Sequence, residues 1–248
     1  GVDDGSQLPA ESAASLIRFR AEGVTQIITT PHFQGSLTHV AALVEARLSE
    51  LDQGWEVLKG IVSADAESAG SPLRVERGAE VALDVPDPEL SDARLRLAGG
   101  PFVLVEYPGL RLPPVNAEMA LVAVRRQGWI PVLAHPERYR NLDPSLAELA
   151  RFREAGAFLQ VNAGSLFGDY GKTAAALARS IFELGWADYV SSDFHAIGSP
   201  GVARFAQAMV EAELAEQLKL LTVINPGRIL TGEPPLAVPP MKPPKEGK

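Results

Sequence analysis

The sequence predicts an α/β protein with a parallel sheet, which is either an α/β barrel or an open sheet covered by helices on both faces. Segments with helical periodicity alternate several times with short apolar segments along the 248 residues. The apolar segments are continuous rather than interrupted by polar residues, as in parallel strands that are buried on both faces. In both architectures, functional side chains gather at the carboxyl ends of the strands.

The first half of the chain begins with a predicted helix over Pro9–Glu22, where apolar residues recur every three to four positions until Gly23. The segment Val24–Thr30 is β-branched and apolar and is ended by Pro31, which predicts a buried strand. The remaining predicted elements of this half are a helix over Thr38–Leu58, a small polar surface loop over Ser63–Ser71, a strand over Leu73–Leu83, a turn at Pro86–Pro88 and a strand over Phe102–Val105.

In the second half, predicted helices that end before a glycine alternate with apolar strands. The helices are Asn116–Gln127, Pro144–Ala155 and Lys172–Leu184, and the glycines that follow them are Gly128, Gly156 and Gly185. The strands are Trp129–Ala134, Ala157–Val161 and Ala187–Ser191. Two more helices are predicted over Val202–Leu218 and Asn225–Leu230.

Residues 1–232 are expected to form one domain, followed by a proline-rich tail. The tail, Glu233–Lys248, contains six prolines. Proline lacks a backbone N–H and cannot continue a helix or a central strand. The tail is therefore expected to be extended and flexible, with a docking peptide for a proline-binding partner as the alternative.

The composition excludes several classes of protein. With 46% hydrophobic and 22% charged residues the chain is not disordered, and no apolar run approaches the ~20 residues of a membrane span. The absence of Cys excludes disulfides, zinc–thiolate sites, iron–sulfur clusters and cysteine nucleophiles. The net charge of −8 disfavours nucleic acid and anionic membrane as partners, and suits carboxylates placed around cations.

Histidine and carboxylate side chains stand at or near the ends of the predicted strands. Burying such a group costs free energy unless it is paired or bound to metal. These candidates are His32, Glu80, Glu106, His135, Asp193 and His195. Residues two apart in an extended segment point to the same side, so Asp193 and His195 can face one cavity while Phe194 packs the other way. His39 stands at a helix start and is expected to be a surface residue.

Each candidate alone has an ordinary explanation, such as a loop histidine or a carboxylate paired with an arginine. Together they come from five of the six predicted strands of one sheet, at positions that random surface charges would not prefer. Imidazole and carboxylate ligands without thiolate suit Mn²⁺, iron or Zn²⁺. Six such ligands exceed what one ion requires, so the sequence predicts a metal cluster.

Six short motifs carry these candidates in a fixed order. They are Asp3-Asp4-Gly5, Thr30-Pro31-His32, Gly78-Ala79-Glu80, Glu106-Tyr107-Pro108, His135-Pro136-Glu137-Arg138-Tyr139 and Ser192-Asp193-Phe194-His195, with Val161–Leu166 and Gly168–Gly171 between the last two. With these motifs the chain resembles the polymerase-and-histidinol-phosphatase (PHP) superfamily. More narrowly, from Gly1 to about Gly232, it resembles the bacterial manganese-dependent protein-tyrosine phosphatases of capsule and exopolysaccharide operons.

The resemblance implies a distorted seven-stranded, TIM-like β/α barrel with three Mn²⁺ ions. The ligands that it implies are Asp4, His32 and His195 for one ion, Glu106 and His135 for a second, and Asp193 for a third, with Glu80 bridging the second and third ions. Arg138 would bind the phosphate, and Asp193 or His195 would give a proton to the leaving group.

Two departures from the family pattern stand out. The family carries a His-x-His pair at the end of its first strand, a few residues before Asp-Asp-Gly. This chain starts at Gly1, so the first barrel strand and that pair are expected to be missing from an N-terminally incomplete sequence. Relatives also carry a phosphate-binding arginine shortly after the Asp-x-His motif. Position 200 is Pro here, and Arg204 is the next basic residue.

The resemblance implies a cytoplasmic, metal-dependent phosphatase that removes phosphate from tyrosine on a bacterial tyrosine kinase, without inserting into the membrane. Two alternatives stay open. One is a small-molecule phosphatase of the histidinol-phosphate type. The other is a noncatalytic remnant that binds a kinase, because the His-x-His pair is absent.

Overall fold

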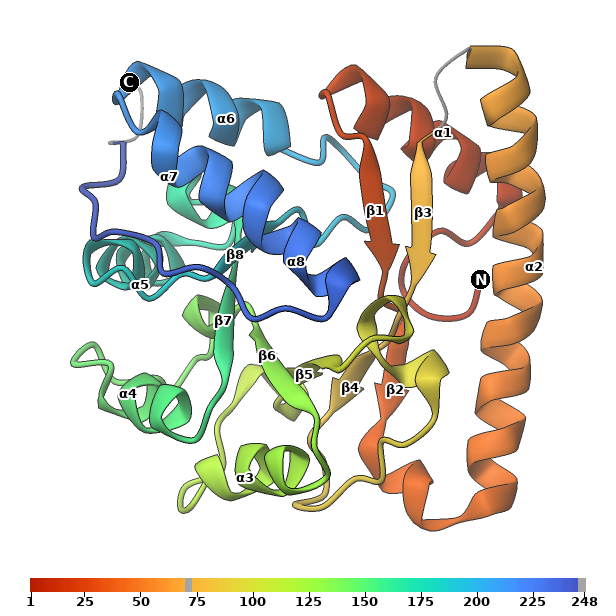
Figure 1. Cartoon of the computed structure of the whole chain (residues 1–248), viewed down its shortest axis with the longest axis horizontal. Helices are drawn as coiled ribbons and strands as arrows, with labels where there is room; N and C mark the ends of the chain where they lie inside the picture. The colour runs from red at the N-terminus through yellow and green to blue at the C-terminus, as the bar shows by residue number, and fades with distance from the viewer. Residues whose placement is uncertain (70–72, 245–248) are drawn as a thin grey trace.

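The central feature of the fold is a six-stranded parallel sheet, seen in a computed structural model that describes residues 1–69 and 73–244 (Figure 1). Its strands, in spatial order, are β2 (His32–Gln34), β4 (Glu80–Ala82), β5 (Phe102–Glu106), β6 (Ile130–Ala134), β7 (Phe158–Asn162) and β8 (Tyr189–Ser191). A second parallel pair joins β1 (Gln26–Thr29) to β3 (Arg74–Arg77). The spatial order follows the chain order, as in repeated βα units.

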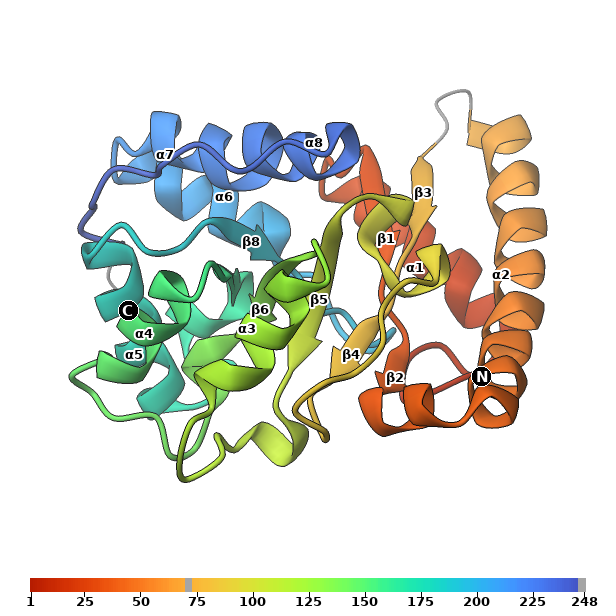
Figure 2. The same cartoon turned by 60° about the horizontal axis from the view of Figure 1, so that its bottom comes forward.

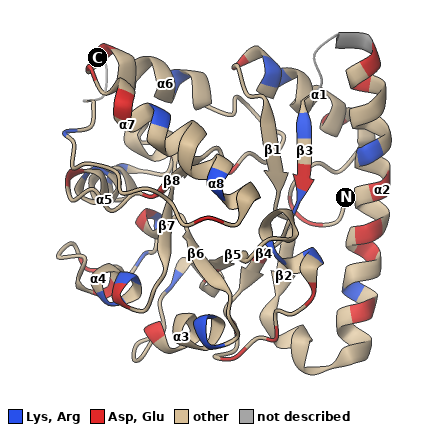
Figure 3. Ribbon diagram, in the orientation of Figure 1, with Lys and Arg blue, Asp and Glu red and all other residues tan. Residues whose placement is uncertain are grey.

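Helices surround this sheet. They are α1 (Pro9–Ala21), α2 (Ala41–Ala69), α3 (Glu118–Arg126), α4 (Ala147–Glu154), α5 (Lys172–Glu183), α6 (Val202–Glu211), α7 (Ala215–Lys219) and α8 (Asn225–Thr231). In the turned view, α2 runs along one side of the molecule and α6, α7 and α8 lie together along another (Figure 2). Acidic residues recur along α2, in keeping with the negative net charge (Figure 3).

The α/β class and the parallel sheet are confirmed, whereas a closed barrel is not seen. Among the strands that the structure describes, β2 and β8 are the two edges of the six-stranded sheet, and no pairing joins them. The described strand pairs therefore do not show the predicted seven-stranded barrel.

Two predicted strands of the first half differ from the structure. The first, Val24–Thr30, corresponds to β1, and a separate strand that was not predicted, β2, follows Pro31, which has no N–H to donate to a neighbouring strand. The second breaks between β3 and β4, at Gly78-Ala79. A Cβ at Gly78 would lie 3.0 Å from Cδ2 of Leu97 and 3.3 Å from its Cα, so a larger residue would press on this neighbour. As a result, His32 and Glu80 stand at the starts of β2 and β4, in register with each other, rather than at strand ends.

Two helix predictions are wrong in extent. The helix expected to end at Leu58 continues as α2 to Ala69, so the part of the expected loop that is described is helical. Alanine and glutamate in this segment favour helix, and Asp65 forms an ion pair with Arg20 of α1. The helix expected over Val202–Leu218 is divided into α6 and α7, because Glu213 adopts a positive φ of 59° between them.

The core forms on both faces of the sheet, as the continuous apolar strands predict. Phe33, Phe102 and Tyr107 are among its largest fully buried side chains. The Tyr107 and Tyr139 rings pack edge to face with centroids 6.0 Å apart, and the Tyr107 backbone N–H donates to the Tyr139 hydroxyl at 3.0 Å. This contact ties the residue after β5 to the turn after β6, directly below the candidate site.

The described part of the proline-rich tail, 233–244, contains neither helix nor strand and packs against the domain. Val238 and Met241 are buried, and the Met241 backbone N–H donates to the Phe182 carbonyl of α5 at 3.2 Å. Asn225 of α8 exchanges hydrogen bonds with the backbone of Leu236. Buried apolar side chains and satisfied backbone groups hold the tail against α5 and α8.

Candidate metal centre

The candidate ligands converge, although they come from six separate segments. Glu106 is the last residue of β5, and His135 directly follows β6. Asp193 and His195 lie in the loop after β8, and Asp4 lies in the N-terminal segment. Together with His32 and Glu80, these residues form three overlapping groups in which the ligand atoms of each group lie within 4.8 Å of one another.

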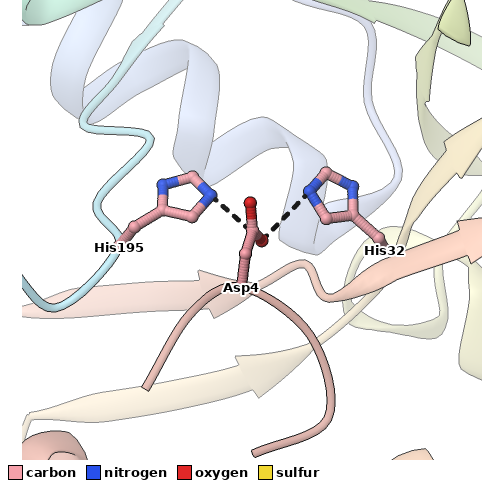
Figure 4. A group of neighbouring side chains, drawn as sticks. All are labelled: Asp4, His32 and His195. Atoms are coloured by element: carbon pink, nitrogen blue, oxygen red, sulfur yellow. Dashed lines mark ion pairs between the residues drawn. The ribbon is translucent and has the colours of Figure 1, made fainter. Parts of the chain in front are cut away.

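The first group is Asp4, His32 and His195 (Figure 4). One carboxylate oxygen of Asp4 lies 3.3 Å from Nε2 of His32 and 3.5 Å from Nε2 of His195. All three side chains are partly exposed, and that of Asp4 is 67% exposed. Asp4 thus links the loop after β8 to the start of β2, at opposite edges of the sheet.

Asp3, which the sequence analysis assigned no role, holds this first group in place. Its carboxylate accepts hydrogen bonds from the backbone N–H of His32 at 3.0 Å and of Gly5 at 3.1 Å. These bonds fix the N-terminal segment against β2, so that Asp4 faces the two imidazoles.

The other two groups share Glu80: one contains His32, Glu80 and Glu106, and the other Glu80, His135 and Asp193. Nε2 of His135 lies 3.1 Å from Oε1 of Glu80 and 3.5 Å from Oε2 of Glu106. The pair that the resemblance assigns to the second ion, Glu106 and His135, is therefore in contact.

Burial sets the electrostatics of this inner part. Burial raises the pKa of Glu106, and the negative charge of Glu80 raises it further. Burial alone would lower the pKa of His135, but its hydrogen bond to Glu80 and the charge of that carboxylate raise the pKa above its usual value. Clustered carboxylates in a buried position need protons or cations to offset their repulsion.

The residues present fit bound divalent cations. The donors are imidazole nitrogens and carboxylate oxygens, a set that suits Mn²⁺, iron or Zn²⁺. The carboxylates of these groups lie close together although their negative charges repel one another. Nδ1 of His135 is buried and has no hydrogen-bond partner in the described part of the chain, so nothing there fixes this imidazole through its second nitrogen.

Arg138 lies next to the third group. It ends the turn that follows His135, and its Nη1 forms an ion pair with Oδ2 of Asp193. Its guanidinium carbon lies 4.5 Å from the centroid of the Tyr170 ring. Burial and the charge of Asp193 raise the pKa of Tyr170 to about 12, so this side chain is a neutral phenol at physiological pH. Sequence reasoning missed Tyr170, which lies within the quoted segment Gly168–Gly171.

Arg204 and His39 have partners of their own. Arg204 forms an ion pair with Asp169 and stacks over the Phe167 ring, with its guanidinium carbon 4.3 Å from the ring centroid. His39 is exposed, as expected for a surface residue, and its Nε2 lies 3.2 Å from the backbone oxygen of Asp87. Neither residue belongs to the three groups formed by the described residues.

Comparison with known proteins decides the family. A family model described as capsular polysaccharide synthesis, CpsB/CapC, matches residues 1–231. The chain belongs to the CpsB/CapC family. This membership agrees with the capsule and exopolysaccharide phosphatases that the sequence motifs resemble.

Curated relatives carry phosphatase names. The tyrosine-protein phosphatase YwqE of Bacillus subtilis is 28% identical over 96% of this chain and 91% of its own length. The tyrosine-protein phosphatase CpsB of Streptococcus pneumoniae is 25% identical over 92% of this chain and 93% of its own length. The putative tyrosine-protein phosphatase CapC of Staphylococcus aureus is 26% identical over 79% of this chain and 73% of its own length.

A solved structure shares the fold. It is 25% identical in sequence, covers all of this chain and 96% of its own, and superposes with a TM-score of 0.68. Its title describes YwqE from Bacillus subtilis and CpsB from Streptococcus pneumoniae as unique metal-dependent tyrosine phosphatases. In the described residues of the present chain, every helix is too short or too polar to cross a membrane.

Proposed function

We propose that this chain is a metal-dependent phosphatase that hydrolyses phosphotyrosine on proteins. The observation that carries the proposal is the convergence of three histidine–carboxylate groups beside Arg138, in a member of the CpsB/CapC family. The named relatives are tyrosine phosphatases, and the protein substrate we propose is a bacterial tyrosine kinase that controls capsule or exopolysaccharide synthesis.

Seven residues would hold the metal, which we propose to be a cluster of Mn²⁺ ions. They are Asp4, His32, Glu80, Glu106, His135, Asp193 and His195. Divalent ions in such a site lower the pKa of water and offset the charge of phosphoryl oxygens. The protein itself contributes the partly buried donors, and the carboxylate of Glu80 belongs to two of the three groups.

Arg138 would bind the phosphoryl group. A guanidinium donates two parallel hydrogen bonds to phosphate oxygens, and the Tyr170 ring lies beside this guanidinium. The leaving phenolate of tyrosine has a pKa of about 10, so it needs less acid assistance than the alkoxide of serine would, and Asp193 or His195 would supply the proton. A phosphocysteine intermediate is excluded because the chain has no Cys.

We further propose that the sheet is the distorted barrel of the PHP superfamily and that the protein acts in the cytoplasm. The approach of the two sheet edges supports a curled sheet, since the His32 and His195 rings lie 6.5 Å apart.

The direct test is phosphate release from a phosphotyrosyl peptide by the purified chain with added Mn²⁺, with EDTA and with histidinol phosphate as rival substrate. We expect hydrolysis of the peptide, loss of activity with EDTA, and little turnover of histidinol phosphate. His195→Ala should abolish hydrolysis, whereas His39→Ala, a matched exposed histidine outside the site, should leave it unchanged. Activity that survives exhaustive chelation would overturn the proposal.

A further inference from the structure

Strand β7 carries two buried polar side chains although it supplies none of the candidate ligands. Gln160 and Asn162 are two residues apart and therefore point to the same side of the strand. Gln160 is 5% exposed and Asn162 is fully buried. Buried amides are stable only when hydrogen-bonded, so their partners indicate what they do.

Gln160 holds the residue that follows β6. Its Oε1 accepts a hydrogen bond from the backbone N–H of His135 at 3.1 Å. Its Nε2 donates to Oδ1 of Asn162 at 2.9 Å. The side-chain amide of Gln160 thus fixes the backbone of His135 through its oxygen and the orientation of the Asn162 amide through its nitrogen.

Asn162 holds the loop that follows β8. With Oδ1 occupied by Gln160, its Nδ2 donates to Oδ2 of Asp193 at 2.8 Å. Its backbone N–H donates at 2.9 Å to Glu137, in the turn that follows His135. That same Glu137 oxygen also accepts from the Ser165 hydroxyl at 2.7 Å. The side-chain amide of Asn162 therefore cannot rotate without losing its hydrogen bonds to Gln160 and Asp193.

The two held residues need such support because their backbones are strained. His135 has φ of 31° and Asp193 has φ of 48°, in the left-handed region that residues other than glycine rarely adopt. Conformations of this kind are strained and persist only where the surroundings enforce them. The two left-handed residues lie just beyond the ends of β6 and β8, the strands that pair with β7 on either side.

We infer that Gln160 and Asn162 are positioning residues, which set the separation and orientation of His135 and Asp193 for metal binding. The inference rests on the proposed function and deepens it, because it assigns β7 a role in a site to which it gives no ligand. Residues that orient metal ligands through hydrogen bonds affect metal affinity almost as strongly as the ligands themselves.

The test compares Asn162→Ala and Gln160→Ala with Asn225→Ala. Asn225 is the matched control because it is equally buried and makes three hydrogen bonds, but to the backbone of Asp188 and Leu236. The Mn²⁺ affinity is measured by competition with a fluorescent chelator, alongside the Tm of the chelated protein and the kcat and KM for a phosphotyrosyl peptide.

We expect all three variants to lower the Tm. Only Asn162→Ala and Gln160→Ala should weaken Mn²⁺ binding, by about tenfold or more. At saturating Mn²⁺ these two variants should lower kcat more than they raise KM. If Asn162→Ala does not fold, the Gln160→Ala variant decides.

Unchanged Mn²⁺ affinity in the folded β7 variants would overturn the inference, as would an equal loss of affinity in Asn225→Ala. Failure of the unaltered chain to bind Mn²⁺ is a distinct result. It would contradict the proposed metal site, and the inference would fall with it.

Discussion

Arg138 and Asp193 form an ion pair across the ends of β6 and β8, through Nη1 of the arginine and Oδ2 of the aspartate. The proposed phosphate-binding residue is thus in direct contact with a proposed metal ligand. A guanidinium on a carboxylate competes with any cation for the same oxygen, because both are attracted by one negative charge. Substrate binding and metal binding are therefore coupled through this pair.

Because of this coupling, we expect Arg138→Ala to affect the kcat/KM and the Mn²⁺ affinity differently. Loss of the guanidinium should lower kcat/KM for a phosphotyrosyl peptide by about a hundredfold or more, as for other removed charge-stabilising donors. The Mn²⁺ affinity should stay the same or increase, because Asp193 loses its competing partner. Steady-state kinetics and a Mn²⁺ titration of one protein sample check both. Weaker Mn²⁺ binding in this variant would contradict the competition.

Glu80 and Asp4 should differ in their effect on metal content. Glu80 is buried and belongs to two of the three groups, whereas Asp4 is exposed and belongs to one. Glu80→Gln should therefore remove more Mn²⁺ per chain than Asp4→Asn. Elemental mass spectrometry of the two variants after removal of excess metal measures this. An equal loss of Mn²⁺ in both variants would contradict the assignment of Glu80 to two of the metal-binding groups.

The metal-free protein should lose stability as the pH rises from about 6 to about 8. His135 and Glu106 both have raised pKa values in the folded state. The unfolded values are about 6.5 and 4.3, so each group binds protons more tightly when folded and its contribution to stability is present at low pH. That contribution is lost as the pH rises through the folded pKa.

A Tm series in EDTA across this range checks the sign, with a fall expected as the pH rises. Saturating Mn²⁺ is the control. It should weaken or reverse the slope, because metal ligands must be deprotonated. A Tm that rises with pH in EDTA would contradict the account.

The packing of the tail predicts a selective effect at Gly185. This residue has φ of 67°, and a Cβ there would lie 2.7 Å from the carbonyl oxygen of Val238 in the tail. Gly128 has φ of 89° and nothing within 4 Å of an added Cβ. Both Gly→Ala variants incur the backbone cost of roughly 1–2 kcal/mol, and Gly185→Ala must also displace the tail.

We expect Gly185→Ala to have a Tm several degrees below that of Gly128→Ala, since 1 kcal/mol shifts the Tm of a chain this size by about 2–4 °C. Differential scanning calorimetry of the two variants measures the difference. Equal Tm values would indicate that the tail does not press on Gly185 in solution.

Much of this site could be predicted from the sequence because strand ends are local features. His135 follows an apolar run, and Asp193 and His195 stand two apart after another, so their convergence follows from a parallel sheet. The motifs then supply Asp4 and Arg138, whose spacing alone would not single them out.

The positioning residues could not be predicted in this way. Gln160 and Asn162 act on residues 25 and 31 positions away, and their role depends on side-chain geometry that periodicity does not encode. The contacts of the tail could not be predicted for a similar reason, since prolines exclude helix but do not indicate the surface against which an extended segment packs.

The ends of some helices and strands were also not predictable from the sequence. The end of α2 depends on contacts with α1, such as the Arg20–Asp65 pair, that no local signal reveals. Pro31 is a local signal for the end of β1, but no signal in the sequence indicates that a second strand, β2, begins directly after it at His32.

The most direct test of the account is the number of Mn²⁺ ions that the purified chain retains, counted by elemental mass spectrometry after incubation with Mn²⁺ and removal of the excess. The three overlapping groups predict two or three ions per chain. A chain that retains no ion would contradict the metal centre and the phosphatase function that rests on it.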